Sequence, residues 1–111
     1  MEQSNTKILY IIVNAGFSAE VMDVAREAGA RGATIINARG EGVAHKSVMG
    51  ITLDSEKEIL MLLMEADTAA SVMAAVKEKA GIHSPSQSIC FTVNVERNTL
   101  INNFPAPDAQ E

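Results

Sequence analysis

The sequence predicts an α+β fold of the ferredoxin-like βαββαβ type, with an antiparallel sheet and two helices on one of its faces. Two continuous apolar runs, at residues 7–13 and 58–64, are each followed by a segment of helical periodicity, and an alternating strand pattern closes the chain. This order matches the split βαβ motif. A chain of 111 residues fits one domain, which we place at residues 7–103 between flexible tails at 1–6 and 104–111.

The first half of the chain begins with a buried strand. Residues 7–13 read KILYIIV, an apolar run rich in β-branched residues that ends at a polar turn. Ser18 is the expected N-cap of the next helix, whose apolar residues recur at helical spacing, and Gly29 is expected to end it. Residues 32–40 are then expected to form a second strand.

A polar segment separates the two halves. Residues 41–47 predict an exposed loop, and residues 48–53 alternate weakly and predict a short strand. The apolar run at 58–64 lies between charged residues, which favours a strand, although periodicity alone does not distinguish it from a buried helix.

The second half repeats the strand-helix-strand order. Asp67 or Thr68 is the expected cap of a helix that ends near residues 77–81, where lysines suit the helix dipole. Residues 83–88 predict a loop, and residues 89–95 alternate as a half-buried strand does.

The two apolar runs carry apolar residues on both of their faces. Two helices can cover only one face of a sheet, so the other would leave a large apolar patch in water, which soluble monomers rarely tolerate. We therefore expect a homo-oligomer in which the open sheet faces of several copies pack against one another.

Composition excludes several classes of function. The net charge of −5 disfavours nonspecific nucleic-acid or anionic-membrane binding, and aromatic residues are only 4% of the chain. No apolar run approaches the roughly 18 residues of a membrane span, so no direct membrane insertion is expected. The single cysteine, Cys90, favours a reduced, cytoplasmic chain.

The residues show no strong catalytic or metal-binding pattern. His45 and His83 lie in different loops, neither at ligand spacing from another His or Cys, and Cys90 is expected to be a small core residue. The pair Gly40-Glu41-Gly42 follows a strand and opens a polar loop that contains Lys46. Glycines let backbone N–H groups approach a phosphate, so this loop is a candidate anion site.

Four short motifs together resemble the PII-like signal-transduction proteins over residues 7–95. In chain order they are Gly29-Ala-Arg-Gly32-Ala-Thr34-Ile35, Arg39-Gly40-Glu41-Gly42, Glu56-Lys57-Glu58-Ile59 and Ile89-Cys-Phe91-Thr-Val93. The resemblance implies a ferredoxin-like trimer that binds adenine nucleotides in clefts between subunits. It also implies a loop after the second strand, the T-loop, that regulates a partner protein such as a transporter or an enzyme.

The resemblance also assigns candidate binding residues. Gly40 and Gly42 match the T-loop glycines that wrap phosphate, and Thr34 matches a threonine near the adenine. The loop before the last strand contributes Gln87, Ser88 and Ile89, and Arg39 and Lys46 are the candidate cations. No cofactor or metal is required, and ATP, ADP, AMP or cyclic AMP is the expected effector.

This chain departs from typical family members in three places. Its T-loop is short and lacks the modifiable tyrosine, since Tyr10 is the only tyrosine of the chain. Pro85-Ser86-Gln87-Ser88 replaces glycines and a lysine, and the basic residues after the last strand are reduced to Arg97. Hydroxyl and amide groups in place of lysine favour a ligand less charged than ATP.

Two other functions remain open at this point. A metal-tolerance trimer of the CutA type shares the architecture, but clusters of metal ligands are missing from the sequence. A small enzyme on the same fold is the other alternative, because this fold carries many chemistries, although no nucleophile-base pair supports it. The regulatory function, without enzymatic activity, is the one we expect.

Overall fold

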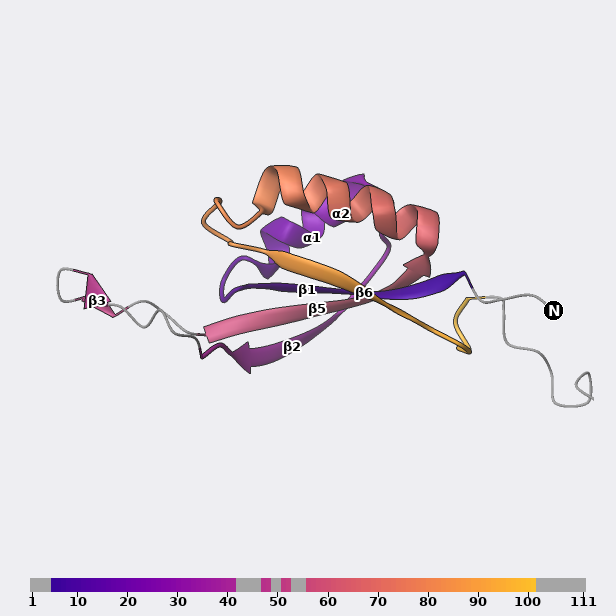
Figure 1. The fold of residues 1–111 in the computed structure, drawn as a ribbon, viewed down its shortest axis with the longest axis horizontal. Coiled ribbons are helices and arrows are strands. Elements are labelled where there is room, and N and C mark those ends of the chain that lie inside the picture. The colour runs from indigo at the N-terminus through magenta and orange to yellow at the C-terminus, as the bar shows by residue number, and fades with distance from the viewer. Residues whose placement is uncertain (1–4, 42–46, 49–50, 53–55, 102–111) are drawn as a thin grey trace, which may run out of the picture.

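The chain folds into a four-stranded antiparallel sheet with both helices on one face (Figure 1). This computed structural model describes residues 5–41, 47–48, 51–52 and 56–101. The strands of the main sheet lie in the order β2-β5-β1-β6, so the two apolar runs are the central strands, as expected. The elements are β1 (Thr6–Asn14), α1 (Ser18–Glu27), β2 (Thr34–Arg39), β3 (Ser47–Val48), β4 (Ile51–Thr52), β5 (Glu56–Glu65), α2 (Ala66–Ala80) and β6 (Ile89–Asn94).

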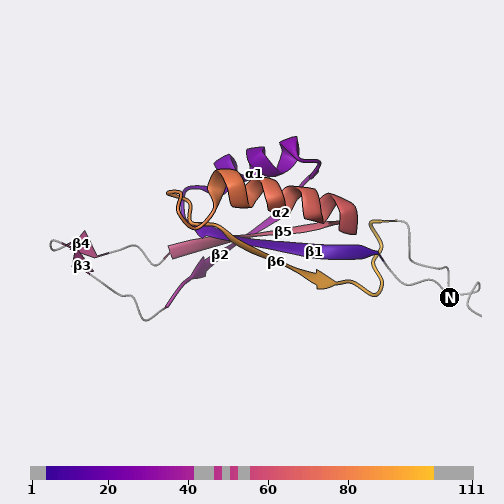
Figure 2. The same ribbon diagram turned by 45° about the horizontal axis from the view of Figure 1, so that its top comes forward.

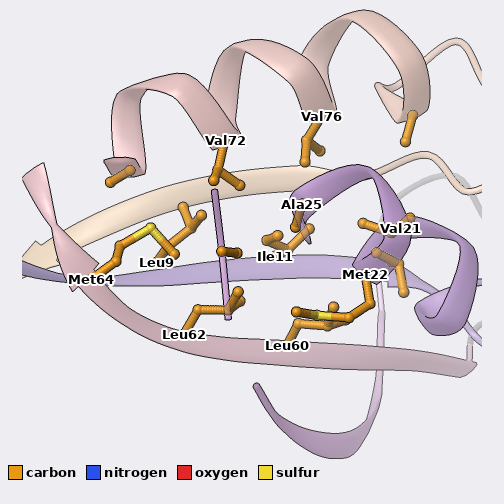
Figure 3. Close-up of a cluster of buried hydrophobic side chains, with 14 residues drawn as sticks. Leu9, Ile11, Val21, Met22, Ala25, Leu60, Leu62, Met64, Val72 and Val76 are labelled. Carbon is orange, nitrogen blue, oxygen red and sulfur yellow. The ribbon is translucent and has the colours of Figure 1, made fainter. Parts of the chain in front are cut away.

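The hydrophobic core lies between the sheet and the two helices (Figure 3). Alternate residues of β1 and β5 point toward the helices, and Val21 of α1 and Val72 of α2 meet them with no exposed surface. Cys90 of β6 packs against this cluster. The buried strand residues are Leu9, Ile11, Val13, Leu60, Leu62 and Met64.

The opposite face of the sheet is apolar and has no helix over it. Antiparallel register aligns the remaining strand residues into one continuous surface, here called the open face, because directly paired residues point to the same side. On β6 these residues are exposed, with Ile89 at 53% and Phe91 at 44%. The apolar residues of the open face are Ile8, Tyr10, Ile12, Ile36, Ile59, Met61, Leu63, Ile89, Phe91 and Val93.

Both helices begin without the capping side chains that were expected. Helix α1 starts at Ser18 itself, with Phe17 in the N-cap position, and α2 starts at Ala66 after Glu65. Neither cap residue makes a side-chain capping bond. The Asp67 or Thr68 prediction is therefore two to three residues late. Phe17 packs against the core at the start of α1, and the N–H of Ala66 donates to the Asn5 carbonyl at 2.9 Å at the start of α2, so long-range contacts take the place of side-chain caps.

The end of α1 matches the prediction at Gly29. Its φ of +117° lies in the left-handed region, where glycine has no steric penalty. The N–H of Gly29 donates to the Arg26 carbonyl at 3.0 Å, and the N–H of Ala30 donates to the Ala25 carbonyl at 3.0 Å. These two bonds form a Schellman motif, which turns the chain back toward β2.

Two strand predictions are corrected. Strand β2 spans Thr34–Arg39, shorter than residues 32–40, since glycine has a weak strand propensity at the first of these positions. Residues 48–53 do not form one strand. Ser47–Val48 and Ile51–Thr52 instead pair antiparallel with each other as β3 and β4.

Candidate functional site

Four segments that are far apart in the sequence meet at one end of the main sheet. Strand β2 ends there, β5 begins there, β1 turns there into α1, and the loop at 81–88 leads from α2 into β6 (Figure 1). Figure 2 shows the same arrangement from a second direction, with β3 and β4 beyond this end. We call this region the β2-exit end. It is the end of the molecule from which the candidate T-loop leaves.

Asn14 links three of these segments at the β2-exit end. The Lys57 ammonium donates to Asn14 Oδ1 at 2.6 Å, joining β5 to β1. Asn14 Nδ2 donates to the Pro85 carbonyl at 2.9 Å and to Gln87 Oε1 at 3.2 Å, joining β1 to the loop before β6. The backbone N–H of Asn14 also donates to the Ser86 carbonyl at 2.9 Å. The lysine is therefore held through Asn14 by two neighbouring segments.

The loop at 81–88 uses its serine hydroxyls for its own structure. Ser86 is buried, and its hydroxyl donates to the Ala80 carbonyl at 3.0 Å at the end of α2. The Ser84 hydroxyl donates to the Gly81 carbonyl at 2.7 Å and lies 2.9 Å from the Ser86 hydroxyl. Ser88 is also buried, and its hydroxyl donates to that of Ser86 at 3.4 Å. These contacts satisfy carbonyls at the C-terminal end of α2 and hold the loop in place.

Gln87 has an unusual backbone conformation within this loop. Its φ of +49° makes it the one non-glycine residue with positive φ in the described part of the chain. Such a conformation is uncommon for glutamine and costs on the order of 1 kcal/mol. The exposed Gln87 side chain lies against Asn14 in this conformation, so the loop and the lysine contact are coupled.

The structure places the described candidate residues in two groups. Arg39 and Gly40 lie at the end of β2, and Gln87, Ser88 and Ile89 lie at the start of β6, all at the β2-exit end. Thr34 lies at the far end of β2, paired with Met61. The remaining two, Gly42 and Lys46, are outside the described residues.

A single chain does not bring these groups into one pocket. Strands β2 and β6 are opposite edges of the sheet, with β5 and β1 between them. Adjacent strands lie about 4.8 Å apart, so three spacings separate the two edges by about 14 Å. Thr34 is a further five residues along β2, about 17 Å from Arg39. A site that uses both edges would need a second copy of the chain.

Sequence reasoning missed Lys57 and Asn14 as candidate site residues. Lys57 stands between two glutamates at the start of an apolar strand, which predicts a solvated turn. The signal that could have identified it was the alternation of side chains along a strand, which places Lys57 on the same face of β5 as Ile59 and Met61. Asn14 closes β1, and its sequence context indicated only the beginning of a turn.

The cysteine and the possible metal ligands noted in the sequence do not form a reactive or metal-binding site among the described residues. Cys90 is half-buried against the core, and burial raises the pKa of its thiol above the usual value. Among the described residues, no group of three or more His, Cys, Asp or Glu side chains is placed to hold a metal ion. Within the same residues, no helix is long and apolar enough to cross a membrane.

Comparison of the sequence with protein-family models shows the family of this chain. The family model described as Nitrogen regulatory protein P-II matches residues 6–102, so the chain belongs to the P-II family of signal-transduction proteins. This confirms the resemblance seen in the sequence motifs. In a separate search, no curated protein matches the sequence.

Two solved structures are similar to this chain in fold. One is a PII-like signaling protein from Thermus thermophilus, with a TM-score of 0.64 and 21% identity over 86% of this chain and 91% of that one. The other is PII from Arabidopsis thaliana bound to citrate, with a TM-score of 0.63 and 20% identity over 84% and 79%. At these identities the likeness establishes the fold.

Proposed function

We propose that the protein is a homotrimeric PII-type regulator that binds an adenine nucleotide in clefts between subunits and controls a partner protein. The observation that carries this proposal is the division of the candidate site between opposite edges of the sheet. The membership in the P-II family supports it. In this proposal the protein acts by binding, without catalysis, and works in the cytoplasm.

The open face supports self-assembly. Ten apolar residues from four strands form this face, and three of them on β6 are between 44% and 53% exposed in the single chain. Covering such a surface with other copies of itself removes apolar area from water, at roughly 25 cal/mol per Å². In a trimer of this kind the β2 edge of one subunit can approach the β6 edge of another, which would bring Arg39 and Gly40 near Gln87 and Ile89.

The chemistry of the β2-exit end supports an anionic ligand. Arg39 and the half-buried Lys57 are its described cations, and Gly40 begins a segment with glycine at alternate positions. The Arabidopsis PII structure holds citrate, a small anion. For this chain we propose an adenine nucleotide, with the carboxylate of a small acid as the competing ligand.

The partner would be contacted by the segment between β2 and β5. Strands β3 and β4 pair within it and lie beyond the β2-exit end (Figure 2). A ligand bound at its base would be well placed to alter that segment. The proposed partner is a transporter or an enzyme.

Two measurements on the purified protein test the proposal. Light scattering gives the assembly state, and a trimer of 11.8 kDa chains is the expected result. Isothermal titration with ATP, ADP, AMP and cyclic AMP is expected to detect binding well below millimolar concentration. A monomer, or the absence of nucleotide binding, contradicts the proposal. Parallel titrations with divalent metals test the CutA-type alternative.

A further inference from the structure

We infer that Lys57 is the anchor for a single phosphoryl group of the proposed nucleotide, and that Asn14 is the residue that positions it. This inference rests on the proposed function and narrows its ligand. The protein should prefer AMP or cyclic AMP to ATP. Three features support this preference: the contacts of Lys57, the charge at the β2-exit end and the state of the neighbouring loop.

The Lys57 ammonium is held but not neutralised. It is half-buried on the open-face side of β5, and its hydrogen-bond partner is the neutral amide oxygen of Asn14 at 2.6 Å. No carboxylate forms an ion pair with it among the described residues. An ammonium has three donors, so two remain after the bond to Asn14. Two donors match two oxygens of one phosphoryl group.

Asn14 determines where this ammonium points. Its Nδ2 is bonded to the Pro85 carbonyl and to Gln87 Oε1, so its Oδ1 must face Lys57. A flexible lysine loses much conformational freedom when it is held in this way, and holding it in advance reduces the entropy cost of binding an anion.

The described residues of the β2-exit end offer few positive charges for a polyphosphate. Among the described residues its cations are Lys57 and Arg39. The register pairs Arg39 with Glu56 on the face opposite Lys57. Each further phosphoryl group of a nucleotide adds negative charge, and a site that binds it tightly needs cations to match.

The loop before β6 does not supply the missing positive charge. Residues 81–88 contain no Lys or Arg. The hydroxyls of Ser84, Ser86 and Ser88 are bonded within the loop and to the end of α2. The backbone N–H groups of Gln87 and Ser88 are also used, by the carbonyls of Ser84 and Ala80. Besides the exposed imidazole of His83, the side chain that this loop offers to a ligand is mainly the uncharged amide of Gln87.

The experiment compares AMP, cyclic AMP, ADP and ATP by isothermal titration in the wild-type protein and its variants. Lys57→Met removes the anchor, and Asn14→Asp keeps the shape of the residue while neutralising the ammonium. Lys7→Met is the matched control, because Lys7 is also a half-buried lysine bonded to an asparagine side chain, Asn94, at the other end of the sheet. Light scattering and thermal melting confirm that each variant is assembled and folded.

The expected wild-type result is that AMP or cyclic AMP binds at least as tightly as ATP. Lys57→Met and Asn14→Asp should each weaken that binding by about 10- to 100-fold, as expected for loss of a charge-assisted contact. Lys57→Arg should retain most of it, and Lys7→Met should change it less than about threefold.

The outcomes separate this inference from the proposed function. If ATP binds more than about tenfold tighter than AMP, or if Lys57→Met behaves like Lys7→Met, the anchor assignment is overturned while nucleotide binding stands. If a variant fails to fold, the anchor assignment is still tested by the order of nucleotide affinities in the wild type and by the affinity of Lys57→Arg. If no nucleotide binds the wild type, the proposed function fails first and the inference falls with it.

Discussion

The rings of Tyr10 and Phe91 stack with centroids 5.3 Å apart and an angle of 27° between their planes. They join β1 to β6 on the open face, where the register places them directly opposite each other. The pair therefore adds aromatic surface to the face that we propose is covered by other subunits.

Phe91→Asp is expected to break the assembly. It places a charge within a surface that the trimer would bury, which is strongly unfavourable without a partner. Light scattering should then report single chains of 11.8 kDa at micromolar concentration. Lys77→Asp, on the exposed side of α2, is the control and should leave the mass unchanged. An intact trimer in Phe91→Asp would show that the open face is not the interface.

Two isoleucines test which layer carries the stability. Ile11 has no exposed surface in the core, whereas Ile35 is 49% exposed on a part of β2 outside that cluster. Ile11→Ala should lower the free energy of unfolding by about 2–5 kcal/mol, through lost burial and the cavity left behind. Ile35→Ala should cost less than about 1 kcal/mol. Urea denaturation at one protein concentration measures both, and equal effects would contradict the assigned layers.

The left-handed backbone at Gln87 predicts a difference between two substitutions. Both Gln87→Gly and Gln87→Val remove the acceptor for Asn14, so their difference reports the backbone alone. Glycine adopts a φ of +49° without strain, whereas a β-branched residue does not. Thermal melting should show Gln87→Val less stable than Gln87→Gly by about 1–2 kcal/mol. Equal stabilities would mean that the loop adopts another conformation in solution.

Cys90 predicts a weak dependence of stability on alkaline pH. Burial raises the pKa of its thiol above the usual 9.0 in the folded chain. The unfolded chain therefore releases this proton at lower pH, so stability is full below the unfolded value and falls as pH rises through the folded one. Denaturation at pH 7 and at about pH 10 should show a loss that Cys90→Ala reduces. A loss of the same size in Cys90→Ala would assign it to other groups.

Much of the fold could be predicted from local pattern alone. The two-sided apolar runs identified β1 and β5 as central strands, because only a strand buried on both faces needs such a run. Helical spacing identified α1 and α2, and Gly29 marked a helix end since its left-handed conformation belongs to the local chain. The caps were missed because long-range contacts, the packing of Phe17 against the core and the bond from the Ala66 N–H to the Asn5 carbonyl, lie at the starts of those helices.

The candidate site is formed by contacts between residues far apart in the chain, which the sequence pattern does not reveal. Lys57 and Asn14 are 43 residues apart, and Asn14 and Gln87 are 73 residues apart. Glycine spacing identified Gly40, and the family resemblance added Gln87, each within its own segment. Only the register of β5 and β6 against β1 brought Lys57, Asn14 and Gln87 together, because a shift of one residue would send each side chain to the other face of the sheet.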